Sequence, residues 1–351
     1  MSASFDLPAG WTAPTSAGQG SGGPFVGLVE NECLKLLRRK RPQLVFLVLA
    51  IFLGISTWAQ WRQQETRDRI SPDEDWRPRA ERRLANAERR AQSRRIFVGV
   101  NRTLRFEAMR LRYHLERDID PDQRTGPLFA RAFAAVASAL LLPLLVTILV
   151  ADLVSSERSA GTIKMLLTRP VSRRRVLASK LVAMALFTSS LVVASALLSW
   201  LIAGVAFGWQ GFDAPVLTGF RFGLDGPDLT NVRMAPLWID TLAAYGLVWF
   251  SALTVGAIGV TFSVLFQSTA AAMGTLLALV VSGVLLGQLA SDWEPTRWIF
   301  VTNLPLAQFY SGVPPPVAGM TLLHSVLVLG VWGVGAIAVG MWVFSRRDVT
   351  A

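Results

Sequence analysis

Six long apolar runs constrain this chain more than any other feature of its sequence. A bilayer core of about 30 Å needs roughly 20 apolar residues in a helix, and each run reaches that length. No run alternates with a period of two, so a β-barrel is not expected. The predicted spans cover residues 42–61, 128–151, 181–207, 241–266, 270–290 and 320–344. The fold class is therefore predicted to be an all-α polytopic membrane protein with six transmembrane helices.

The composition excludes several other classes of protein. Charged residues make up 17% of the chain and hydrophobic residues 52%, which excludes both an ordinary soluble domain and a disordered chain. One cysteine, Cys33, and two histidines, His114 and His324, leave little for disulfides, a metal site or acid–base catalysis. The sequence contains neither a P-loop motif nor H-E-x-x-H or G-x-S-x-G. We therefore expect no enzyme activity and no cofactor in this chain.

Short basic segments predict the orientation of the chain in the membrane. Lysines and arginines cluster before the first span, between the second and third spans at 152–180, and after the sixth span at 345–351. The positive-inside rule places these segments, and so both termini, in the cytoplasm. The loops at 208–240 and 291–319 are poorer in basic residues and are expected outside. The formal charge of +11 is accordingly attributed to contact with anionic lipid.

One long loop conflicts with this rule. Residues 62–127 carry 17 arginines and 12 acidic residues, yet the predicted topology places them outside the cytoplasm. The rule weakens for loops longer than about 60 residues, so the orientation is kept. A solvated pair of helices is expected there, because acidic residues are interspersed and aromatic residues that could stack on bases are few. No nucleic acid partner is expected, whereas a lid or a docking surface for another external component stays open.

Two segments before the first span differ in character. Residues 1–24 are rich in Gly, Ser, Thr and Pro, and predict a flexible cytoplasmic tail without a secretory signal. Residues 25–41 predict an amphipathic helix whose apolar stripe lies in the headgroup layer. Its polar side, with Lys35, Arg38 and Arg39, is expected to face away from the stripe, and its basic end to meet anionic lipid. The alternative is a plain basic flank that only fixes the topology.

The segment at 152–180 is the most informative one between the spans. Ile163, Leu166 and Leu167 share one helix face, at spacings i, i+3 and i+4. Pro170 ends this helix, because the residue before a proline avoids the α region. An apolar stripe that faces the cytoplasm needs a partner to cover it. The pattern thus predicts a short cytoplasmic helix that docks onto another protein, followed by a break before the third span.

The same segment resembles the E-x-x-x-G-T-x-x-x-L-L-x-x-P-V-S-R signature of ABC-2 type transporter permeases. The matching positions are Glu157, Gly161, Thr162, Leu166, Leu167, Pro170, Val171, Ser172 and Arg173, with Lys180 following. The six-span layout, the acidic Glu32 in the amphipathic helix and a last span ending in Phe344 to Asp348 are similar to the same family. The likeness covers nearly all of the chain except 1–24 and 62–127, and the enlarged first external loop resembles one subgroup of the family.

This resemblance implies the transmembrane permease subunit of an ATP-driven exporter in the cell (inner) membrane of a bacterium or archaeon. Two such subunits pair, as a homodimer or a heterodimer, and each binds a separate cytoplasmic P-loop ATPase subunit. A cytoplasmic coupling helix would dock into the ATPase, with Glu157 in a charged contact beside the amphipathic helix. The resemblance assigns ATPase coupling to Glu157, Gly161, Thr162, Ile163, Leu166, Leu167, Pro170 and Arg173, and the interfacial helix to Glu32, Arg38 and Arg39.

Two hypotheses from other classes stay open beside the exporter. One is an ion-coupled carrier or channel, which is opposed by the near absence of ionisable residues inside the predicted spans. The other is a non-transporting membrane scaffold or sensor whose external loop at 62–127 binds a ligand. The sequence gives no substrate, and the direction of transport follows from the resemblance alone.

Overall fold

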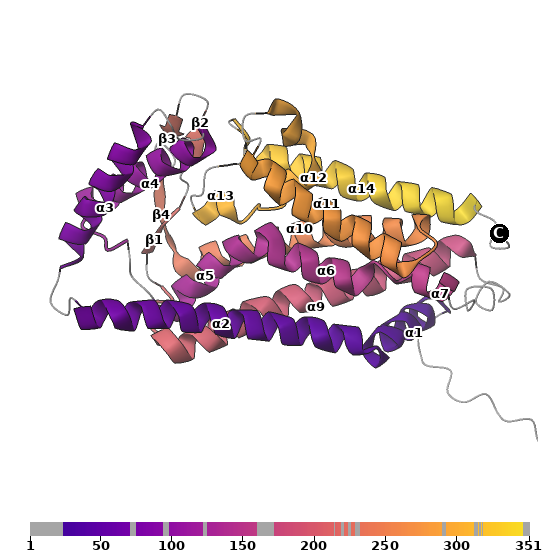
Figure 1. The fold of residues 1–351 in the computed structure, drawn as a ribbon. Helices are drawn as coiled ribbons and strands as arrows, with labels where there is room; N and C mark the ends of the chain where they lie inside the picture. Colours follow the sequence, from indigo (N-terminus) through magenta and orange to yellow (C-terminus); the bar gives the residue numbers. More distant parts are fainter. Residues whose placement is uncertain are drawn as a thin grey trace, which may run out of the picture.

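The described helices form one bundle, and six of them are long and apolar enough to cross a membrane (Figure 1). The computed structural model describes residues 24–70, 75–93, 98–121, 125–159, 172–213, 215–218, 221–223, 226–228, 232–289, 293–311, 315, 317 and 319–346. The six are α2 (Lys40–Ile70), the composite of α5 (Gly126–Val136) and α6 (Leu142–Val150), α9 (Arg173–Phe207), α10 (Leu237–Leu265), α11 (Thr269–Leu289) and α14 (Leu322–Arg346). The predicted all-α polytopic class is confirmed.

The second span is interrupted just before a proline. A π-helical turn at Ala137–Leu141 joins α5 to α6, and Pro143 is the second residue of α6. The ring of a proline clashes with the carbonyl four residues earlier, and a widened turn relieves that clash. The carbonyl of Pro143 itself accepts a hydrogen bond from Thr147 Oγ1 at 2.8 Å. The irregular turn therefore lies where the second span meets Pro143.

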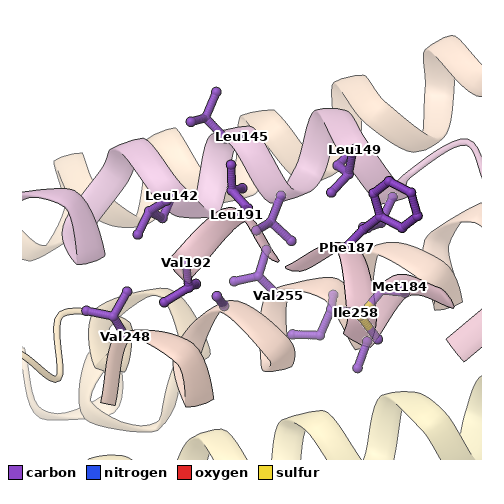
Figure 2. Close-up of a cluster of buried hydrophobic side chains, with 14 of the residues drawn as sticks. Leu142, Leu145, Leu149, Met184, Phe187, Leu191, Val192, Val248, Val255 and Ile258 are labelled. Carbon is purple, nitrogen blue, oxygen red and sulfur yellow. The ribbon is translucent and has the colours of Figure 1, made fainter. Parts of the chain in front are cut away.

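The core of the bundle lies between α6, α9 and α10. Their buried leucines, valines and larger side chains interdigitate, as Figure 2 shows for Leu142 and Leu145 of α6, Leu191 of α9 and Val255 of α10. Small residues let the backbones approach closely elsewhere. A Cβ at Gly126 of α5 would lie 2.8 Å from the backbone of Gly204 in α9. By contrast, the apolar windows of α2, α11 and α14 are each only 22% buried, as expected of helices that face lipid.

A helical hairpin stands at the end of the bundle opposite to α1 (Pro24–Arg38) (Figure 1). It consists of α3 (Trp76–Ala91) and α4 (Val98–Glu116). The seam between them is built from small and aliphatic residues spaced by three and four: Ala80, Leu84, Ala87 and Ala91 on α3, and Leu104, Ala108 and Leu111 on α4. Phe106 connects the hairpin to the segment between α9 and α10, where it packs with Val232.

Two short β ladders are the departure from a purely helical chain. β1 (Pro215–Thr218) pairs antiparallel with β4 (Arg233–Pro236), with Val216 opposite Ala235. Between them, β2 (Arg221–Gly223) pairs antiparallel with β3 (Gly226–Asp228). Strands of three or four residues carry too little periodic signal to be predicted from sequence. They supply hydrogen bonds to a loop backbone that would otherwise have none.

The segment between α11 and α14 enters the bundle, whereas the sequence predicts an external loop at 291–319. It forms η2 (Glu294–Trp298), α12 (Phe300–Asn303) and α13 (Gln308–Ser311). Phe300, Val301, Leu304 and Leu306 are buried in the same core as the spans. Gly283 of α11 leaves the space that Val301 occupies, since a Cβ there would overlap the valine. Asn303 fixes the turn, because its Nδ2 donates to the carbonyls of Arg297 and Ile299 at 2.8 Å each.

Candidate functional site

Four charged side chains meet at the α1 end of the bundle, and together we name them the charge ring: Glu32, Lys35, Glu157 and Lys180. α1 contributes Glu32 and Lys35, one helical turn apart. The short helix α7 (Ser155–Ser159), directly after the second span, contributes Glu157. Lys180 lies two turns into α9. The charge ring thus joins three segments that are distant in sequence and close in space (Figure 1).

Each lysine of the charge ring bridges both glutamates. Lys180 Nζ lies 2.7 Å from Glu32 Oε2 and 2.8 Å from Glu157 Oε2. Lys35 Nζ lies 2.7 Å from Glu32 Oε1 and 2.9 Å from Glu157 Oε1. Lys180 also donates its third proton to the carbonyl of Leu153 at 3.0 Å. Each of the four carboxylate oxygens therefore lies within 2.9 Å of a lysine Nζ, and the ring of ion pairs is closed.

Because the charge ring is largely buried, each of its charges must be paired. The side chains of Lys180, Glu32 and Glu157 are 1%, 5% and 8% exposed, and that of Lys35 is 33% exposed. A charge taken out of water costs several kcal/mol unless it is paired and hydrogen-bonded. Two positive and two negative charges cancel here, so the ring is neutral as a whole. Removing one member would leave a net charge in a largely buried site.

The ring also sets the ionisation of the α1 residues around it. Burial lowers the pKa of Lys35, but the hydrogen bonds and negative charges of Glu32 and Glu157 outweigh burial and raise the pKa above its ordinary value. Lys35 therefore stays protonated throughout the physiological range. Burial likewise raises the pKa of the Cys33 thiol, and the neighbouring Glu32 carboxylate raises it further. Cys33 is accordingly a poor thiolate at neutral pH.

A second set of contacts fixes the residues that lead into α7. Asp152 forms ion pairs with Arg39, at 2.9 Å, and with Arg41. Arg39 also donates to Ser156 Oγ at 3.1 Å. On the other side, Arg158 donates to the carbonyls of Val264 and Phe266, at 3.2 and 3.3 Å, at the C-terminus of α10. The chain from 152 to 159 is consequently tied to α1, α2, α9 and α10 at once.

The structure brings together part of the predicted site. Glu157 and Glu32 meet in the charge ring, and Arg173 is the first residue of α9, after Ser172 in the N-cap position. Arg38 is exposed at the end of α1. Gly161, Thr162, Ile163, Leu166, Leu167 and Pro170, and with them the predicted coupling helix, lie outside the described residues.

Two residues of the predicted polar side of the amphipathic helix form ion pairs that the sequence did not predict. Lys35 and Arg39 reach Glu157 and Asp152. Leu34 and Leu37, 46% and 58% exposed, share the exposed surface of α1 with Glu30, Asn31 and Arg38. The physical reason is that buried acidic residues on α7 and at the end of the second span attract the cations of α1. Lone charges at the margins of apolar runs, such as Asp152 and Lys180, were the available signal.

A separate ion pair stands at the opposite end of the spans. Arg131 of α5 pairs with Asp240 in the first turn of α10, and their side chains are 14% and 1% exposed. Tyr245 lies nearby, with its hydroxyl 2.9 Å from Ser199 Oγ and 3.3 Å from the carbonyl of Ala130. This pair locks α5 to α10 where the bundle meets the hairpin. In the part of the chain that the structure describes, no group of three or more metal-binding side chains gathers.

These features define a class, that of multi-pass α-helical membrane proteins with a buried ionic cluster at one end of the bundle. Within it, the chain belongs to the family described as Protein of unknown function (DUF2705), which matches residues 101–350. It is similar to the uncharacterized membrane protein YdbK of Bacillus subtilis (strain 168), at 30% identity over 213 residues, 60% of this chain and 78% of YdbK. It is also similar to the uncharacterized protein YhcI of the same organism, at 27% identity over 239 residues, 68% of this chain and 74% of YhcI.

Proposed function

We propose that this protein is the permease subunit of an ATP-driven exporter of the ABC-2 type, coupled to a separate P-loop ATPase subunit. The observation that carries the proposal is the charge ring. Glu157 lies four residues before Gly161, where the segment with the apolar stripe begins. A displacement of that segment would be passed through Glu157 to Lys180 on α9 and to Lys35 on α1. ATP would be hydrolysed by the partner subunit. This chain would supply the substrate pathway and, through Glu157, the mechanical link to the spans.

The ends of the bundle support one orientation for this proposal. α1, α7 and the C-terminus of α14 lie at the same end (Figure 1), as an even number of spans requires. That end carries the exposed Arg38, Lys40, Arg174 and Arg175, so the positive-inside rule favours the cytoplasm for it. The ATPase would then meet the segment at 160–171 from the cytoplasm. Two copies of the permease, or this chain and a related one, would pair in the cell (inner) membrane of a bacterium.

The apolar stripe gives the decisive experiment. Leu166→Asp would place a charge in the ATPase groove, so we expect it to abolish co-purification of the partner P-loop ATPase. Lys164→Ala changes a residue of the same segment outside the apolar stripe, so it is the matched control and should keep the ATPase bound. Both changes lie outside the spans, so membrane insertion should be normal in both. Retention of the ATPase by Leu166→Asp, or its absence from the wild-type preparation, would favour the scaffold or carrier hypotheses.

The mechanical link through Glu157 is tested by a substitution that leaves the apolar stripe unchanged. Glu157→Ala leaves Lys35 and Lys180 with one glutamate between them, so the link from α7 to α1 and α9 is lost. We expect the complex to form and to hydrolyse ATP, but substrate-stimulated hydrolysis across a panel of candidate substrates should disappear. Equal stimulation in the mutant and the wild type would show that Glu157 has no part in coupling.

A further inference from the structure

The α3–α4 hairpin carries a large excess of positive charge among the described residues. α3 and α4 together hold ten arginines and four glutamates, an excess of six positive charges. Part of this charge braces the hairpin: Arg83 pairs with Glu107 at 3.1 Å, and Arg112 pairs with Glu88 at 2.6 Å. The braces use two of the four glutamates, so the excess of arginine charge remains.

The packing of the two helices turns this charge outward. The alanine and leucine seam occupies the inner faces of both helices. Arg82 and Arg89 are seven residues apart and therefore lie on one face of α3. Each follows a seam residue, Ala80 or Ala87, by two positions, which places it about 200° around the helix from the seam. Both are exposed, as is Arg90 on the same helix, about 100° around from Arg89. We define Arg82, Arg89 and Arg90 as the arginine face.

We propose that the arginine face is a binding surface for an anionic polymer that carries phosphate groups. This goes beyond the permease function and needs no ATPase. Guanidinium forks bind phosphate oxygens in pairs, and a concentrated positive field raises the local concentration of a polyanion. In the proposed orientation the hairpin stands outside the cell, so the ligand is an extracytoplasmic polymer, one that the permease exports or one that surrounds it.

The side chains that the hairpin exposes favour a charged polymer as the ligand over a protein or a membrane surface. Among the described residues of α3 and α4, the one large hydrophobic side chain that is exposed is Val100, at 43%. A protein partner would want buried apolar or aromatic anchors at the centre of its interface, and a bilayer surface would want an apolar face to insert. The polar end of α2, from 62 to 70, also lifts the hairpin about 13 Å beyond the last apolar turn. A charged polymer needs neither anchor nor contact with the bilayer.

The test uses the purified full chain in a neutral detergent, with fluorescent inorganic polyphosphate as the probe. Arg89→Gln combined with Arg90→Gln removes two charges from the arginine face. The matched control, Arg174→Gln combined with Arg175→Gln, removes two exposed charges at the opposite end of the bundle. We expect the hairpin variant to weaken binding about tenfold and to flatten its salt dependence, with less than about a twofold change in the control. Arg89→Lys with Arg90→Lys should keep most of the affinity.

Three further results would overturn the proposal. Equal losses in the hairpin variant and the control would show a general attraction of the whole basic chain. Poly-glutamate binding as tight as that of polyphosphate, or tight binding to vesicles of phosphatidylglycerol that the hairpin variant loses, would assign the surface to an acidic protein or to lipid. Thermal unfolding of both variants at the wild-type temperature is the control for the fold, since all four arginines are exposed.

Discussion

The two ends of the bundle hold charge in opposite ways. At the α1 end, the four charges of the charge ring are largely buried, sum to zero, and each contacts two partners of opposite sign. At the other end, α3 and α4 expose an excess of positive charge to solvent. Burial explains the difference, because a charge removed from water must be paired while a solvated one need not be. The paired charges at the α1 end therefore hold three segments of the chain in one arrangement. The unbalanced charges of the hairpin produce a positive electrostatic field in the solvent.

The largest expected effect comes from breaking the charge ring at its most buried member. Lys180→Met should lower the free energy of unfolding by about 3–5 kcal/mol, because it leaves two buried carboxylates with Lys35 alone. Thermal and denaturant unfolding in detergent measure this. Adding Glu157→Gln removes the surplus negative charge and should restore part of the loss. A Lys180→Met protein within about 1 kcal/mol of the wild type would mean that water reaches the ring.

The variant Asp240→Asn tests whether the stability lost on breaking an ion pair depends on its burial or on the end of the bundle where it lies. Its partner Arg131 is at the hairpin end but inside the bundle, and its side chain is 14% exposed. Leaving Arg131 without a carboxylate should cost about 2–3 kcal/mol, less than at Lys180 because some solvent reaches the guanidinium. The double change Asp240→Asn with Arg131→Gln serves as the control. A loss of stability smaller than that from breaking a surface ion pair would contradict the conclusion that burial sets the cost of an unpaired charge.

A surface ion pair of the hairpin should matter much less. Arg112→Ala breaks the pair with Glu88, in which the two side chains are 65% and 38% exposed. We expect a loss of at most about 1 kcal/mol, and a smaller one in high salt, because solvent screens both groups. The same unfolding assay applies. A loss near that of Lys180→Met would erase the contrast between the two ends.

The smallest effect concerns Cys33, which lies beside the ring member Glu32. Because burial and the Glu32 carboxylate raise the pKa of the Cys33 thiol, little of it is thiolate at pH 7, so labelling with a maleimide should be slow. Raising the pH should speed labelling, and Glu32→Gln should speed it at constant pH by removing a neighbouring negative charge. A rate unchanged by Glu32→Gln would place the carboxylate too far away to act on the thiol.

The position of residues along the chain predicted much of the fold but little of the charge ring. Apolar runs of about 20 residues predicted six membrane helices, because no other element can satisfy its own backbone inside a bilayer. Glu157 and Glu32 were singled out through a motif and a resemblance. Lys35 was predicted on the polar side of its helix but its partner Glu157 was not, since an amphipathic pattern ranks residues by polarity and does not show which buried acid a cation will meet.

Length and apolarity by themselves determined that this chain spans a membrane with six helices, since both are local properties of the sequence that the bilayer selects. The tertiary structure decided where the loops and charges go. Phe300 and Leu304 were assigned to an external loop, yet Gly283 gives their segment room inside the core. Lys180 and Glu32 are 148 positions apart, and their pairing depends on how α1 packs against α9. Such contacts are set by the packing of distant helices, and no pattern within a single segment encodes them.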